Sequence, residues 1–131
     1  MGRVVHFEIN VDDPERAEAF YTGAFGWQFH RWEGPVDYWL IHTGDASTPG
    51  IDGAMMRRMG SSSAVGEDLP VAAYVCTISV DELDGSRQAV EAGGGSLVSD
   101  KRAVPGVGWF CYARDPEGNL FGMMQEDPAA A

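Results

Sequence analysis

The chain has 131 residues, of which 44% are hydrophobic, and its 20 acidic and 9 basic residues give a net charge of −11. This length allows one buried core and is short for two independent domains, so we expect a single domain over residues 1–131. The negative charge would repel a phosphate backbone or an anionic lipid surface, which argues against nucleic acid and membranes as partners.

No apolar run at the N-terminus is long enough for a signal peptide, and no window approaches the roughly 20 apolar residues of a membrane span. We therefore expect a soluble, cytoplasmic protein. Cys76 and Cys111 lack the close spacing of a zinc or redox pair, and we interpret both as reduced thiols in the core.

The first half of the chain predicts one helix among four strands. Alternation and breaks at Gly and Pro place the strands at residues 3–10, 27–33, 36–43 and 51–57. Asp13 is a suitable N-cap, Pro14 suits the first turn, and Glu15 faces the positive end of the helix dipole. Four apolar residues at helical spacing predict packing on a sheet, namely Ala17, Phe20, Tyr21 and Phe25.

The second half follows a linker predicted at residues 60–70, which is rich in small and polar residues. Its helix begins with Asp81 or Asp84 as the N-cap. The strands are predicted at residues 72–80, 96–104, 106–113 and 118–126. Residues 127–131 are expected to form a frayed tail.

The two halves repeat each other with a period of about 70 residues. Val11-Asp12-Asp13 matches Val80-Asp81-Glu82, Trp39 matches Trp109, and Gly53 matches Gly122. Each half therefore reads as strand, helix, strand, strand, strand. The first repeat spans about residues 1–59 and the second about residues 71–126.

Three segments carry a resemblance to a known family: VVHFEINVDDPERAEAFYTGAFGW at 4–27, DYWLIHTGD at 37–45 and PGVGWFCYARDPEGNLFGMMQ at 105–125. With the internal repeat, they resemble the vicinal-oxygen-chelate superfamily of glyoxalase, bleomycin-resistance and dioxygenase-like proteins. The resemblance implies an α+β fold of two βαβββ repeats that form cupped mixed sheets, with ligands held in the cup. It also implies a homodimer.

Strand alternation indicates which side chains of the first strand face this cup. Val5, Phe7 and Ile9 form the apolar face that should pack against a helix. His6 and Glu8 then face the cup, where an imidazole beside a carboxylate can bind a metal or move a proton. For His30 and His42, exposure on the surface is expected.

In metal-dependent relatives, the resemblance implies ligands on the first and last strands of each repeat. His6 is the one family-position ligand that the chain retains, because the other positions fall at Gly53, Val75 and Gly122. Glycine and valine supply no side-chain ligand, and working divalent sites need three or four protein ligands. We therefore expect that the chain binds neither the usual metal of the family nor another cofactor. The alternative is that it binds a divalent metal.

Small and flexible side chains favour a ligand in the space that a metal would take. Tryptophan and methionine suit a small, partly aromatic molecule, which polar groups would orient. The predicted ligand-binding residues are His6, Glu8, Trp39, Met55, Thr77, Trp109, Gly122 and Met124. Any single tryptophan or methionine among them is equally well explained by the core or by a dimer interface.

Three functions remain open on these residues. The leading prediction is a protein that binds a small, partly aromatic molecule without the usual metal site of the family. The second is an enzyme of the lyase, isomerase or dioxygenase type, in which His6 and Glu8 hold a metal or act as base and acid. The third is a ligand-free interaction module whose cup is filled by its own side chains.

Overall fold

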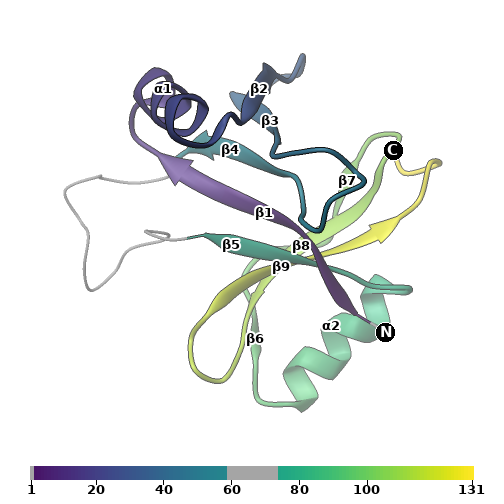
Figure 1. The fold of residues 1–131 in the computed structure, drawn as a ribbon. Helices are drawn as coiled ribbons and strands as arrows, with labels where there is room; N and C mark the ends of the chain where they lie inside the picture. Colours follow the sequence, from purple (N-terminus) through teal and green to yellow (C-terminus); the bar gives the residue numbers. More distant parts are fainter. Residues whose placement is uncertain (1, 59–73) are drawn as a thin grey trace. The chain divides into compact units, whose positions relative to one another are not determined.

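The computed structural model describes residues 2–58 and 74–131, which belong to two compact units (Figure 1). The N-terminal unit is His6–Tyr74, and the C-terminal unit is Met1–Val5 with Val75–Ala131. The linker predicted at residues 60–70 lies outside the described residues. Whether the chain folds as a single domain stays a prediction.

The first repeat forms a mixed sheet in the order β2-β3-β4-β1. Strand β1 runs parallel to β4, and the other neighbours are antiparallel. The elements are β1 (Arg3–Val11), α1 (Pro14–Phe25), β2 (Gln28–Arg31), β3 (Tyr38–His42) and β4 (Gly53–Arg57). The predicted strand, helix, strand, strand, strand order is therefore confirmed in this half.

Helix α1 begins with the predicted capping chemistry. The Asp13 side chain accepts a hydrogen bond from the Arg16 backbone N–H, and Pro14 opens the first turn. Gly26 ends the helix with φ of 74°, a left-handed conformation that glycine adopts without a steric penalty. These caps fix where the chain leaves β1 and where it enters β2.

The core of the N-terminal unit lies between α1 and its sheet. Its buried side chains are Phe7, Ile9, Ile41 and Met55, with Ala17 and Tyr21 of the helix packed against them. Two members of the predicted helical stripe are not part of this core, since Phe20 and Phe25 are 58% and 63% exposed. Their rings contact each other and the rings of Tyr21 and Trp27, which do pack against the core. Val5 is also exposed, so the predicted apolar face of β1 holds only for Phe7 and Ile9.

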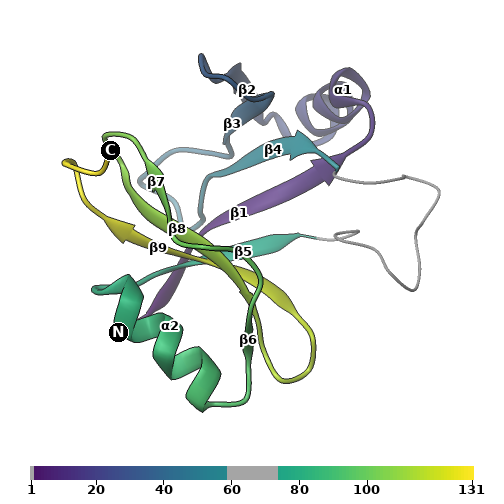
Figure 2. The same cartoon turned by 180° about the vertical axis from the view of Figure 1, so that it is seen from behind.

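The second repeat forms a sheet in the order β5-β9-β8-β6, with β7 also paired to β8 (Figure 2). Helix α2 contacts β6, β8 and β9. The elements are β5 (Val75–Ser79), α2 (Leu83–Ala92), β6 (Ser96–Leu97), β7 (Arg102–Val104), β8 (Gly108–Arg114) and β9 (Leu120–Glu126). The α+β class is confirmed.

Two predictions in this half were wrong in detail. The strand predicted at residues 96–104 is split, because the backbone N–H groups of Val98 and Ser99 both donate to the Tyr112 carbonyl. Two residues facing one is the geometry of a bulge, which bends the strand. The N-cap of α2 is Glu82 and neither Asp81 nor Asp84, because the Glu82 carboxylate accepts from the backbone N–H groups at 84 and 85.

The C-terminal unit has its own core of Leu83, Cys111, Ala113 and Met123. Cys111 is buried as predicted, but Cys76 is exposed, so the prediction of a core thiol was wrong for Cys76. The expected frayed tail is also wrong, since Ala130 is buried and its carbonyl accepts from the Gly106 backbone N–H. In the part of the chain that the structure describes, neither helix has the length and apolar character needed to cross a membrane.

Candidate functional site

The candidate site lies in the N-terminal unit, on the face of its sheet opposite the core. Cross-strand pairing sets which side chains share a face, because directly paired residues point the same way. Phe7, Gly53 and Ile41 are paired across three strands and point towards the core. Their neighbours along the strands therefore point to the other face.

A pocket of about 500 Å³ opens on this second face. We call it the histidine pocket, and it is lined by His6, Gln28, His30, Leu40, Ile41, His42, Asp52 and Gly53. All three histidines of the chain take part in its wall. The expected exposure of His30 and His42 is confirmed, yet both side chains line the same pocket as His6.

His6 is half-buried in this wall. Burial lowers its pKa below the usual 6.5, because a charged imidazolium loses hydration there, while the negative charge of Asp52 opposes the shift. The ring is therefore neutral near pH 7 and able to accept a proton. Its Nε2 atom lies 3.5 Å from the Tyr38 hydroxyl oxygen.

The predicted partner of His6 is buried on the same strand, since Glu8 is only 6% exposed. Its carboxylate is hydrogen-bonded to the Tyr38 hydroxyl, and burial and this negative charge both raise the pKa of Tyr38. Tyr38 therefore stays protonated and donates to the carboxylate, which is the stronger acceptor. The phenolic oxygen is then an acceptor for Nε2–H of His6, which leaves Nδ1 as the proton-accepting atom.

A histidine–aspartate pair lies at the end of β3. His42 Nδ1 lies 2.9 Å from Asp52 Oδ2, and the other oxygen of Asp52 accepts from the Thr43 backbone N–H at 2.8 Å. These bonds lower the pKa of Asp52, with the backbone N–H as the largest cause. Asp52 is therefore an oriented, ionised acceptor for one nitrogen of the His42 ring.

The structure separates two other predicted residues from His6 and Glu8. Met55 is fully buried in the core beneath α1, and Trp39, its cross-strand partner, packs against the same core. Both point away from the histidine pocket. Their predicted place in the cup was therefore wrong. The prediction put Gly53 and Met55 on the same face as His6, but Gly53 is paired with Phe7, which points to the core.

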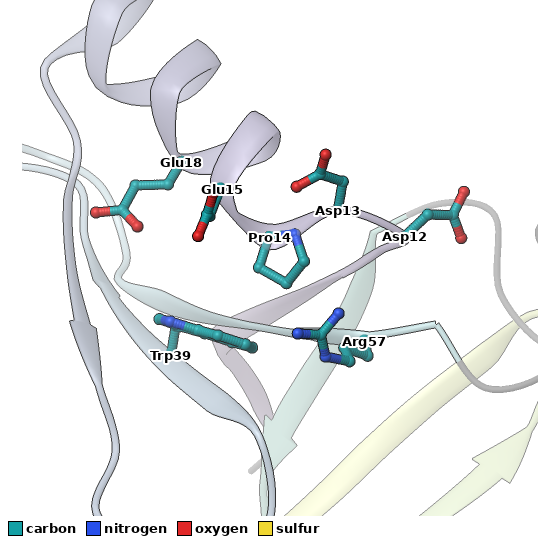
Figure 3. A pocket seen from close by; sticks show the side chains of 7 residues that line it. All are labelled: Asp12, Asp13, Pro14, Glu15, Glu18, Trp39 and Arg57. Carbon is teal, nitrogen blue, oxygen red and sulfur yellow. The ribbon is translucent and has the colours of Figure 1, made fainter.

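Trp39 instead lines a hollow of about 540 Å³ at the start of α1 (Figure 3). We call it the Trp39 pocket, and it is lined by Asp12, Asp13, Pro14, Glu15, Glu18, Trp39 and Arg57. The guanidinium groups of Arg31 and Arg57 lie 5.4 and 5.9 Å from the centre of the tryptophan ring. Figure 3 shows the helix carboxylates on one side and the tryptophan and arginine side chains on the other.

Three predicted residues share one face of the C-terminal sheet. Thr77 is paired with Gly122, and Met124 follows two residues later on the same strand. A Cβ atom at Gly122 would lie 2.6 Å from the Phe110 ring, so a side chain at this position would require that ring to shift. Within the described residues, the Thr77 hydroxyl is a buried oxygen without a hydrogen-bond partner.

Trp109 points to the other face of the C-terminal sheet. It packs against the core of that unit, and its ring nitrogen donates to Asp127 at 3.0 Å. The Lys101 ammonium lies 5.0 Å from the ring centre. These contacts account for Trp109 as a structural side chain, which corrects its placement on the cup wall.

The donor set does not fit a family-type metal in the described residues. Residues 2–58 and 74–131 contain no group of three or more His, Cys, Asp or Glu side chains that could hold a metal ion. Asp52, the carboxylate beside Gly53, is already bonded to His42 and Thr43. The expectation of a metal-free site stays a prediction for direct measurement.

Sequence reasoning missed Tyr38 and Gln28. Alternation along residues 38–42 would have placed Tyr38, Leu40 and His42 on one face. Nothing in the sequence indicated that this face of β3 is the face of the sheet that carries His6. The register between two strands cannot be read from one strand alone. The pairing of Gln28 with His42 and of Leu40 with His30 follows only from the folded sheet.

Comparison with known proteins gives similarities over nearly the whole chain. Residues 3–44 match the bleomycin resistance protein-like N-terminal family. A glyoxylase-like domain-containing protein of Didymella fabae is 33% identical over 90% of this chain and 89% of its own length. A probable lactoylglutathione lyase of Vibrio parahaemolyticus is 26% identical over 99% of this chain and 95% of its own length.

Solved structures give the same fold at lower identity. Methylmalonyl-CoA epimerase from Mycobacterium tuberculosis superposes with a TM-score of 0.67 at 18% identity, covering 95% of this chain and 88% of its own. At such identity the likeness concerns the fold, and function must be argued from the site.

Proposed function

The chain belongs to the glyoxalase-like proteins of the vicinal-oxygen-chelate superfamily, and from this premise we propose that it binds a small carbonyl compound in the histidine pocket and transfers a proton on it without a metal. One observation carries the proposal: the three histidines of the chain line a single pocket, and one of them is half-buried and neutral. Histidine is the side chain that most often moves protons near neutral pH.

His6 is the proposed base. Its Nδ1 atom accepts a proton from a carbon next to the carbonyl group of the bound compound. The Glu8 carboxylate and the Tyr38 hydroxyl hold the ring in this tautomer. The negative charge of Asp52 stabilises the imidazolium that forms, since it already acts to raise the pKa of His6.

The names of two similar proteins suggest the class of compound. One relative is named a probable lactoylglutathione lyase, and one structural neighbour is a methylmalonyl-CoA epimerase. Both named compounds are acyl thioesters, whose carbonyl group acidifies the neighbouring C–H bond. A thioester of a short acyl group is therefore the first substrate class to test.

Solvent exchange measures this proton transfer without knowledge of the product. S-lactoylglutathione and methylmalonyl-CoA are each incubated with the protein in D₂O, and loss of the proton next to the carbonyl is followed by NMR. Wild type should catalyse exchange with at least one of them. His6→Gln should lower the rate by about 100-fold, a common contribution of a positioned base.

Folding of the variant is checked in parallel by circular dichroism and thermal unfolding. A folded His6→Gln variant that exchanges as fast as wild type would remove His6 from the mechanism. Absence of exchange above the buffer rate with both thioesters would contradict proton transfer on this substrate class.

Binding without turnover is the second candidate. It is favoured by the family match over residues 3–44, which includes His6, Gln28, His30 and His42 of the pocket wall. A resistance protein can act by holding a compound, and the imidazole rings offer flat surfaces for a partly aromatic ligand. Calorimetric titration with bleomycin tests this candidate, with His42→Gln as the variant expected to weaken binding.

A further inference from the structure

We propose that His42, held by Asp52, is a second acid–base group of the histidine pocket, opposite His6. The proposal rests on the proposed function, since it names a second proton-transfer group for the same site. Its geometric part, the orientation of the His42 ring, can be tested without any substrate.

The ring of His42 is positioned through a short series of contacts. Asp52 Oδ2 lies 2.9 Å from Nδ1 of His42, and Thr43 fixes the other carboxylate oxygen through its backbone N–H at 2.8 Å. The Thr43 hydroxyl donates to the Ile51 carbonyl at 2.7 Å, which ties the two ends of the β3–β4 loop together. The acceptor for Nδ1–H is thus part of a closed loop.

An exposed pair of this kind adds little to stability, and both side chains are about half exposed, at 55% and 50%. The pair instead fixes the orientation of the His42 ring. Because the carboxylate accepts Nδ1–H, the ring exchanges protons with a ligand only through Nε2. His42 lines the pocket, where its remaining nitrogen can meet a bound molecule.

Sheet register places His6 and His42 on opposite sides of Asp52. Phe7, Gly53 and Ile41 are paired across β1, β4 and β3. One step further along each strand, His6, Asp52 and His42 form the next row. The two histidines are then two strand spacings apart, roughly 10 Å between Cα atoms, which leaves room for a small acyl group between the rings.

Two groups on one substrate allow a balanced proton transfer. His6 takes the proton from the carbon next to the carbonyl, and the electron pair of the C–H bond moves into an enolate. Protonated His42 gives its Nε2 proton to the enolate carbon or oxygen. The substrate loses one proton and gains one, and exchange of protons with water then returns both rings to their starting states.

The first test is the tautomer of His42, read from long-range ¹⁵N–¹H NMR of the imidazole rings. Above the pH at which the ring becomes neutral, wild type should carry the proton on Nδ1. In Asp52→Asn the amide can donate to Nδ1, so the proton should move to Nε2. Asp45→Asn is the matched control, because Asp45 is in the same loop and its charge also acts on His42, but its carboxylate accepts a hydrogen bond from Ser47 instead of from His42.

The second test uses the deuterium-exchange assay with the thioester that wild type turns over. His42→Gln should lower the exchange rate by about 100-fold and Asp52→Asn by about tenfold, while Asp45→Asn stays at the wild-type rate. If Asp52 acts through His42, the double variant should be no slower than His42→Gln alone.

These results distinguish a failure of the His42 proposal from a failure of the proposed function. An Nε2–H tautomer in wild type would overturn the positioning by Asp52, whatever the exchange rates. A wild-type rate in folded His42→Gln would overturn its acid–base role while leaving His6 in place. If Nδ1–H is found but neither thioester exchanges, the proposed function fails for this substrate class, and with it the acid–base role of His42.

Discussion

At the residue scale, the Tyr38 hydroxyl connects His6 and Glu8, which are two positions apart on β1. Its hydroxyl is bonded to the buried Glu8 carboxylate and lies 3.5 Å from His6 Nε2. In Tyr38→Phe the carboxylate loses one donor while it stays buried. The free energy of unfolding should fall by about 1–3 kcal/mol, measured by urea denaturation.

Tyr74→Phe is the matched control for this substitution. Its hydroxyl donates to Tyr21 at 2.8 Å, but the side chain is half exposed. Water can replace that bond, so we expect a change within about 0.5 kcal/mol. Equal losses in the two variants would show that the hydroxyl of Tyr38 has no special role beside Glu8.

Burial of His6 predicts a dependence of stability on pH. Its pKa in the folded chain is below the unfolded value near 6.5, although Asp52 opposes the shift, and Tyr38 and Glu8 lie beside it. As the pH falls below about 6.5, the unfolded chain binds a proton that the folded chain does not. Wild type should lose stability over this range.

His6→Gln should lose less stability over the same range, because this titrating group is gone. Thermal unfolding at pH 7.5, 6.5 and 5.5, all chosen around the ordinary pKa of histidine, measures the difference between the two proteins. Parallel pH curves for wild type and variant would show that burial of the His6 ring does not depress its pKa.

At the element scale, the approach of β1 to β4 depends on a glycine. A Cβ atom at Gly53 would lie 2.5 Å from the Phe7 carbonyl oxygen and 2.7 Å from its ring. Backbone atoms of a paired strand cannot move away cheaply. Gly53→Ala should therefore destabilise the protein by about 1–3 kcal/mol in chemical denaturation.

Gly23 provides the opposite case within α1. Nothing lies within 4 Å of a Cβ atom there, and the residue is in a regular helix. Gly23→Ala should stabilise the protein by about 0.5–1 kcal/mol, because alanine has less backbone freedom to lose. No loss of stability in Gly53→Ala would contradict the packing described for β1 and β4, and a loss of stability in Gly23→Ala would contradict the open space described around Gly23.

Local signals in the sequence predict the elements well where the chemistry is local. Asp13 and Pro14 act within the first turn of α1, and their roles could be read directly. The second helix differs because Asp81, Glu82 and Asp84 all carry a side chain able to cap it. Only the backbone geometry selects Glu82.

The candidate site was predictable only in part, because some of its contacts are local to one strand and others depend on how strands pair. His6 and Glu8 share a face by simple alternation, which needs one strand. Tyr38, His42 and Asp52 join them through the pairing of β3 and β4, which depends on sheet register. Trp39 and Trp109 do occupy matching positions in the two repeats. The match was interpreted as marking a cup, whereas each ring packs against the core of its own unit.

At the scale of the whole molecule, the repeat of about 70 residues corresponds to two units, each with a core of its own. The first is βαβββ, and in the second one strand of that pattern is divided into β6 and β7. The homodimer that the resemblance implied stays a prediction. Light scattering during size-exclusion chromatography should give twice the monomer mass. A monomer mass at all concentrations tested would contradict the family-derived expectation.

We propose that proton transfer in the histidine pocket needs no metal, and this claim can be tested in one measurement. Deuterium exchange into S-lactoylglutathione and methylmalonyl-CoA is compared before and after treatment of the protein with a chelator. We predict an unchanged rate after metal removal and a loss of about 100-fold in His6→Gln. Exchange that stops with the chelator and returns with Zn²⁺ or Ni²⁺ would contradict the claim and assign the chemistry to a metal centre.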